Sequence, residues 1–121
     1  PIISALMGGI SENILFDHRF NFISSEYTLE EVKRYISLIS IKSGVGENEI
    51  GEALSLLPIK IYPKKNYKDK IEIADKIMGK IDKKDIDILA LSIKENCFIW
   101  SEDKDFRNLK EVNLIRTKDL I

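Results

Sequence analysis

The sequence predicts an α/β fold in which a mainly parallel central sheet is flanked by helices, forming a three-layer sandwich. Short runs of branched and aromatic residues alternate along the chain with longer segments whose apolar residues recur every three or four positions. The run "CFIW" at 97–100 is apolar throughout, as in strands buried on both faces of a parallel sheet. With 121 residues and no internal repeat or linker, the chain is expected to form one domain, 1–121.

The first half of the chain is predicted to hold one strand and three helices. Ser11 is the expected N-cap of the first helix, and Pro58 stops the third. Between them, the spacing of Leu29, Val32 and Ile36 indicates an amphipathic helix. The predicted elements are a helix at 11–16, a strand at 20–25, a helix at 28–42 and a helix at 47–57.

The second half is predicted to alternate between strands and helices more regularly. Ile71, Ala74 and Ile77 mark one helix, and Asp85 opens the next, whose buried face includes Leu89 and Ala90. The predicted elements are a strand at 59–63, a helix at 71–78, a helix from 85, and strands at 97–101 and 112–117.

The composition is that of a globular chain, with 44% apolar and 32% charged residues. The net charge is −1, so nucleic-acid binding would have to be local. The lysine-rich segment 60–84 is interpreted as a solvated helix face, with a phosphate-contacting surface as the alternative. No apolar run reaches the roughly 18 residues of a membrane span and no signal-peptide pattern occurs, so a cytoplasmic protein is expected. The single cysteine, Cys97, excludes an internal disulfide and is predicted to be a buried thiol.

Three acidic residues fall where the predicted strands open onto their connecting loops. Glu31 is expected in the first turn of the helix after the first strand, Asp103 follows the strand at 97–101, and Asp85 starts the preceding helix. Like charges 4 Å apart repel by about 4 kcal/mol at an effective dielectric near 20, so a cation would have to compensate such a cluster. Ligation by oxygen alone indicates Mg²⁺ or Mn²⁺, ions suited to phosphodiester hydrolysis.

Each of these acids also has a purely structural interpretation. Thr28 and Glu31 fit a Ser/Thr-x-x-Glu capping box. Asp85 is a good N-cap, and Asp87 would then be a solvated charge in the first helical turn. Asp103 is compatible with ordinary turn chemistry. Capping and metal ligation are not mutually exclusive, since one carboxylate can do both.

The segment 85–106, "DIDILALSIKENCFIWSEDKDF", resembles the C-terminal signature of PIN domains. In that signature an Asp opens a helix with a Leu-Ala-x-Ala-like run, and the following strand ends in Ser or Thr, one residue, and Asp. The corresponding residues here are Asp85, Ser101 and Asp103.

Two weaker motifs extend this resemblance over essentially the whole chain. "YTLEEVKRY" at 27–35 is similar to the second PIN motif, whose acid is Glu31, and the opening "PIISALM" is similar to the tail of the first. The first-motif Asp would precede Pro1 by about three positions. We therefore expect a single PIN-like domain lacking the N-terminal residues of its first strand.

The resemblance implies a Mg²⁺- or Mn²⁺-dependent endoribonuclease, in many relatives the toxin of a toxin–antitoxin pair. It implies metal ligation by Glu31, Asp85 and Asp103, with Asp105 as an auxiliary acid and Ser101 as a supporting hydroxyl. The implied partners are an RNA substrate, an antitoxin protein and a second copy in a homodimer. Without the first acid, the alternative is a catalytically impaired module that binds RNA or a partner protein. A flavodoxin-type phosphatase or receiver domain is unsupported, because no Gly-rich phosphate loop occurs.

Overall fold

Helices make up most of the chain in its computed structural model, which describes residues 2, 6, 8–78, 85–103, 106, 109 and 112–121. The α-helices are α2 (Ile10–Leu15), α3 (Glu26–Arg34), α4 (Ile36–Ser43), α5 (Glu47–Leu56), α6 (Lys64–Tyr67), α7 (Ile71–Met78) and α8 (Ile86–Glu95). The described part of the chain also contains the 3₁₀ turns η1 (Lys68–Lys70) and η3 (Thr117–Asp119).

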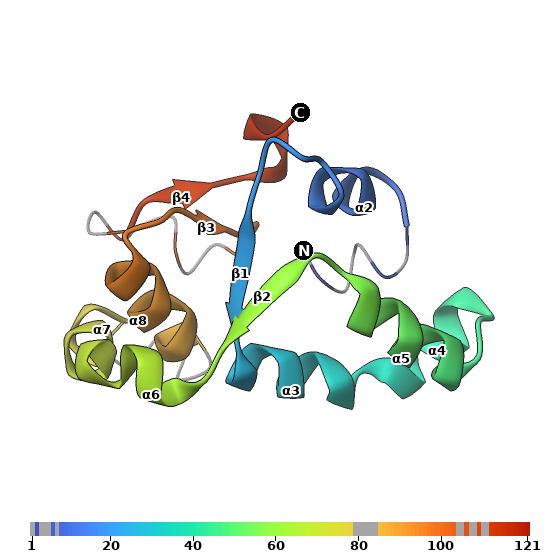
Figure 1. Cartoon of the computed structure of the whole chain (residues 1–121), viewed down its shortest axis with the longest axis horizontal. Coiled ribbons are helices and arrows are strands. Elements are labelled where there is room, and N and C mark those ends of the chain that lie inside the picture. Colours follow the sequence, from blue (N-terminus) through green and yellow to red (C-terminus); the bar gives the residue numbers. More distant parts are fainter. Residues whose placement is uncertain are drawn as a thin grey trace.

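The described strands form two separate parallel pairs. One pair consists of β1 (Phe22–Ser25) and β2 (Ile59–Tyr62), with Phe22 opposite Ile59. The other consists of β3 (Ile99–Trp100) and β4 (Leu114–Ile115). Figure 1 shows β1 and β2 near the middle of the molecule, with β3 and β4 above α8. The predicted α/β class and the parallel pairing of its strands are confirmed, with the sheet smaller than expected.

The strand predicted at 97–101 is shorter than its apolar sequence suggested. Only Ile99 and Trp100 are in β3, which pairs with β4 and with no other described strand. Phe98 is 64% exposed, and Cys97 is only partly buried. Burial raises the pKa of the Cys97 thiol, as expected for a partly desolvated cysteine.

The helix predicted at 28–42 is divided into α3 and α4 at Tyr35. The Tyr35 amide bonds to the carbonyl of Val32, a tight 3₁₀-type contact that ends α3, and its own carbonyl accepts the first bond of α4 from Ile39. The helix α4 ends at Gly44, which has a left-handed φ of 74°. This termination agrees with the prediction.

The main core lies where α6, α7 and α8 pack together beside β3. The predicted inner face of α8 is confirmed for Leu89 and Ala90, while Leu91 is an additional buried residue. The helix α6 was not predicted, yet its Tyr67 is fully buried in this core. The buried members of the core are Tyr67, Ala74, Met78, Leu89, Ala90, Leu91, Ile99 and Phe106.

Candidate active site

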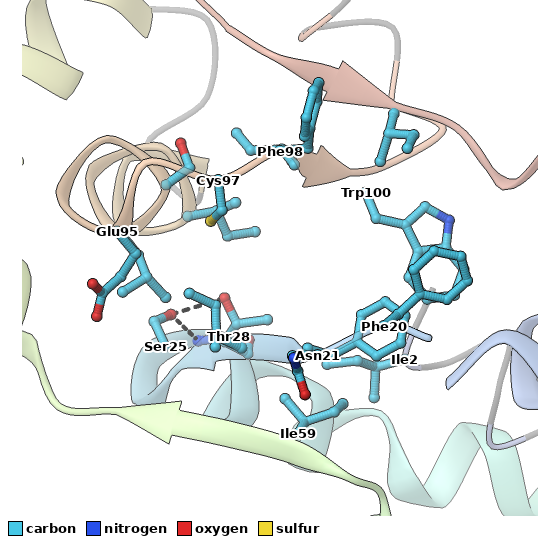
Figure 2. A pocket seen from close by; sticks show the side chains of 18 of the residues that line it. Ile2, Phe20, Asn21, Ser25, Thr28, Ile59, Glu95, Cys97, Phe98 and Trp100 are labelled. Atoms are coloured by element: carbon cyan, nitrogen blue, oxygen red, sulfur yellow. Dashed lines mark hydrogen bonds between the residues drawn. The ribbon is translucent and has the colours of Figure 1, made fainter. Parts of the chain in front are cut away.

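Ser25 connects the carboxyl end of β1 to the start of α3. It is fully buried, its Oγ accepts the Thr28 amide proton at 3.0 Å, and its hydroxyl donates to Thr28 Oγ1 at 2.9 Å. Figure 2 shows both bonds as dashed lines. Ser25 is therefore the N-cap of α3, and the predicted capping box of Thr28 and Glu31 is wrong.

Glu31 consequently lies in the second turn of α3 and not in the first. The side chain is partly buried, and helix capping no longer explains why an acid occupies this position. The helix that carries it contacts β1, β2 and α8. Glu31 is thus placed on a helix that packs against the helix opened by Asp85.

Asp85 occupies the predicted N-cap position of α8 and is 9% exposed. Its side chain makes no capping hydrogen bond to the helix, so the interpretation as an ordinary N-cap is only partly correct. A carboxylate with so little exposure is costly unless it is compensated. Hydrogen bonds, ion pairs and bound cations are the groups that can supply such compensation.

Asp87 was predicted to be a solvated charge, and this is wrong. It is 7% exposed, and its Oδ2 accepts a hydrogen bond of 2.5 Å from the hydroxyl of Tyr67. Nothing in the apolar periodicity indicated this pair, because Tyr67 lies in a lysine-rich segment without a recognisable helix pattern.

The Tyr67 phenol is held in its protonated form. Burial raises its pKa, and the hydrogen bond to Asp87 and the charge of Asp87 raise it further, while Ser25 acts in the opposite direction. Tyr67 therefore acts as a hydrogen-bond donor to the Asp87 carboxylate. Ser25, Tyr67 and Asp87 form a buried polar cluster where β1, α6 and α8 meet.

Ser101 and Asp103 follow β3, which is a strand of the second pair. The Oγ of Ser101 accepts the amide proton of Asp103 at 2.9 Å, so the predicted supporting hydroxyl orients the backbone of this acid. Asp103 is exposed, and the neighbouring Glu102 accepts the Thr117 amide proton at 2.7 Å, which links this turn to η3. Asp105 lies outside the described residues.

The structure places the three predicted metal ligands on different elements. The helices that carry Glu31 and Asp85 pack against each other, whereas Asp103 follows a strand of the other pair. Among the described residues, no group of three acidic, histidine or cysteine side chains has an arrangement that could hold a metal ion. The described residues therefore do not assemble the predicted three-acid set.

A cavity of about 740 Å³ separates the two strand pairs and is called here the inter-sheet groove. Its walls come from β1, β2, β3 and α8 and are largely apolar, as Figure 2 shows for Ile59, Phe98 and Trp100. The rings of Phe22 and Trp100 meet with their centroids 5.4 Å apart, so the two pairs touch at this point. Sequence patterns had given no indication of this groove.

Comparisons with known proteins identify the family. Residues 1–116 match the family model described as PIN domain. No curated protein and no solved structure matches the chain significantly. No described helix has the length and apolar character needed to cross a membrane. PIN domains are generally nucleases that depend on a divalent metal. Because the match covers nearly the whole sequence, the chain belongs to the PIN domain family.

Proposed function

We propose that this protein is a Mg²⁺- or Mn²⁺-dependent endoribonuclease that hydrolyses phosphodiester bonds of cytoplasmic RNA. The observation that carries this proposal is the burial of Asp85 at the start of α8, beside the helix that bears Glu31, in a chain of the PIN family. Oxygen donors in such a position favour a hard divalent cation.

Glu31, Asp85 and Asp103 are the proposed ligands of the ion. When bound, it would supply positive charge against the charge that develops as water attacks phosphorus. Ser101 orients the Asp103 backbone through its hydroxyl, and Asp105 is proposed as an auxiliary acid. The substrate and the site are both anionic, so groups outside the carboxylate set have to attract the RNA.

We also propose that residues 1–121 form one PIN-like domain with the layers of a three-layer sandwich. The inter-sheet groove supports this, because it is apolar and lies between two parallel pairs that share no ladder. A strand in the groove would join β1 and β3 into one mainly parallel sheet and complete a three-layer sandwich. It would also bring Asp103 onto the same sheet as the elements next to Glu31 and Asp85.

The test uses single-stranded RNA and two forms of the protein, this chain and one extended upstream from its natural codons. We expect cleavage in Mn²⁺, none in chelator, and a loss of at least about 100-fold on Asp103→Ala, since such a change removes a proposed ligand. Asp75→Ala is the matched control, because Asp75 is an exposed acid on α7. Equal activity of Asp103→Ala and Asp75→Ala would contradict the assignment.

The alternative proposal is a PIN-like module that binds RNA or a partner protein without cutting RNA. It is favoured by the incomplete assembly of the three acids among the described residues. Retention of RNA by both forms of the protein, with no cleavage in Mn²⁺ or Mg²⁺, would support it over the nuclease.

A homodimer and an antitoxin partner belong to the same proposal. Exposed apolar side chains on and beside α4 and α5, among them Leu38, Ile41 and Leu56, offer a surface for protein contacts. Light scattering after size-exclusion chromatography measures the dimer directly. A monomer at micromolar concentration would contradict this part of the proposal.

A further inference from the structure

Four lysines gather on the short segment that follows β2. Lys64 and Lys65 are in α6, Lys68 and Lys70 are in η1, and we call this set the α6 surface. The first three are exposed and the fourth is partly exposed. In the part of the chain that the structure describes, none of the four has an ion-pair partner.

The one acid within this segment, Asp69, forms an ion pair with a lysine of another helix. Its Oδ2 lies 3.1 Å from Nζ of Lys94 on α8, and this hydrogen bond holds the pKa of Asp69 below its ordinary value. Lys76, the lysine of the following helix α7, is different, because it pairs with Glu72 on the same helix. The α6 surface therefore concentrates positive charge that no ion pair among the described residues offsets.

The α6 surface has a fixed position relative to the candidate active site. A four-residue helix is unstable by itself, but Tyr67 anchors α6 through its buried ring and its hydrogen bond to Asp87. Asp87 is two residues from Asp85 in the first turn of α8. Figure 1 shows α6 at the end of β2, beside α7 and α8.

We infer that the α6 surface binds the phosphate backbone of single-stranded RNA next to the acidic site. This inference rests on the proposed function and names the part of the protein that holds the substrate. Lysines that neutralise phosphates release counterions, so the binding constant depends steeply on salt. They also offset the repulsion between RNA and the carboxylates of Glu31 and Asp85, which the net charge of −1 cannot do.

The experiment measures fluorescence anisotropy of a labelled single-stranded RNA with the full chain in chelator, over a series of salt concentrations. The test variant is Lys64→Gln/Lys65→Gln/Lys68→Gln. The control, Lys33→Gln/Lys42→Gln/Lys118→Gln, removes the same charge from exposed lysines on α3, α4 and η3. Circular dichroism checks that both variants remain folded.

We expect the test variant to bind RNA at least about tenfold more weakly, with a salt slope smaller by about 2, since each lost contact on a single strand contributes about 0.7. The control should stay within about twofold of the unmodified chain, with an unchanged slope. Equal losses in the two variants would overturn the inference, because they would reflect net charge alone. Lysine-dependent binding to anionic lipid vesicles without RNA binding would overturn it as well.

The outcomes separate this inference from the proposed nuclease. RNA binding that depends on the α6 surface, without cleavage in Mn²⁺, supports the inference and contradicts the nuclease. Cleavage and binding that are both unaffected by the three substitutions support the nuclease and contradict the inference. An unmodified chain that binds no RNA contradicts both.

Discussion

Tyr67 and Asp87 show how one buried hydrogen bond can position a segment with almost no other apolar residues. The phenol contributes its ring to the core and its hydroxyl to a carboxylate that is itself nearly inaccessible to water. A hydrogen bond with one charged partner is stronger than a neutral one, and a buried carboxylate that loses its donor retains the full cost of desolvation. The position of α6 therefore depends strongly on this pair.

Tyr67→Phe is predicted to lower the free energy of unfolding by about 1–3 kcal/mol, because Asp87 then stays buried without the phenol donor. The matched control is Tyr35→Phe, since Tyr35 is 37% exposed at the junction of α3 and α4. Urea denaturation at neutral pH measures both variants. Similar losses in the two would show that the bond between Tyr67 and Asp87 contributes no net stability.

The raised pKa of Tyr67 predicts a loss of stability in alkaline solution. An ordinary tyrosine ionises near pH 10, whereas the folded protein keeps Tyr67 protonated to higher pH. Its contribution is therefore complete below about pH 10 and declines as the pH rises further, because only the unfolded chain ionises there. The stability difference between the unmodified chain and Tyr67→Phe should shrink above pH 10. A difference that is constant from pH 7 to 11 would contradict this.

At the scale of single elements, the start of α3 shows why caps are difficult to assign from sequence. Ser25 and Thr28 are both suitable N-caps. Thr28 was favoured because Glu31, three residues later, completes the Ser/Thr-x-x-Glu pattern of a capping box. The choice is decided by the end of β1, which buries Ser25 and directs its hydroxyl to the Thr28 amide. That information lies in the packing of a strand and not in the local pattern.

Ser25→Ala is predicted to destabilise the protein by about 1 kcal/mol through loss of the α3 cap. Glu31→Gln should change stability by less than about 0.5 kcal/mol, because Glu31 caps nothing, while it reduces RNA cleavage if it binds the metal. Thermal or urea unfolding of the two variants compares them directly. A larger loss of stability in Glu31→Gln than in Ser25→Ala would favour the capping box of Thr28 and Glu31.

Elements with strong boundary signals were predicted well. The helix α5 ends just before Pro58, and the apolar residues of α7 recur at regular helical spacing. Both helices therefore match their predicted ranges within one residue. The helix α6 could not be found, since Tyr67 is the only large apolar residue in "KKNYKDK" at 64–70. The burial of Asp87 was missed for the same reason, because its partner lies twenty residues away.

For the whole molecule, the main difference from the predicted fold is the separation of its strands into two pairs. Parallel strands were expected from the alternating pattern, and both pairs are parallel. Whether the two strand pairs join into one sheet depends on contacts between segments distant in the sequence. The local apolar pattern of the sequence does not encode those contacts. Glu31, Asp85 and Asp103 were named from motifs, but their meeting at one ion depends on this arrangement.

Metal binding should therefore stabilise the whole domain if the three acids assemble. With Mn²⁺ at 100 times its dissociation constant, the free energy of unfolding of the upstream-extended protein is predicted to rise by about 2.7 kcal/mol. Asp85→Asn should remove most of this gain, whereas Asp75→Asn on α7 should keep it. Unfolding curves with and without the ion measure the effect. A gain that survives Asp85→Asn would exclude Asp85 from the ligand set.

Trp100 is the only tryptophan in the chain, and its indole lies at the wall of the inter-sheet groove. The ring packs against Phe22, and its Nε1 donates to Thr117 Oγ1 at 3.1 Å. The protein thus carries an intrinsic fluorophore whose emission reports on one place only. A peptide segment that entered the groove and displaced water from the indole would shift that emission to shorter wavelength, so occupancy can be followed optically without any label.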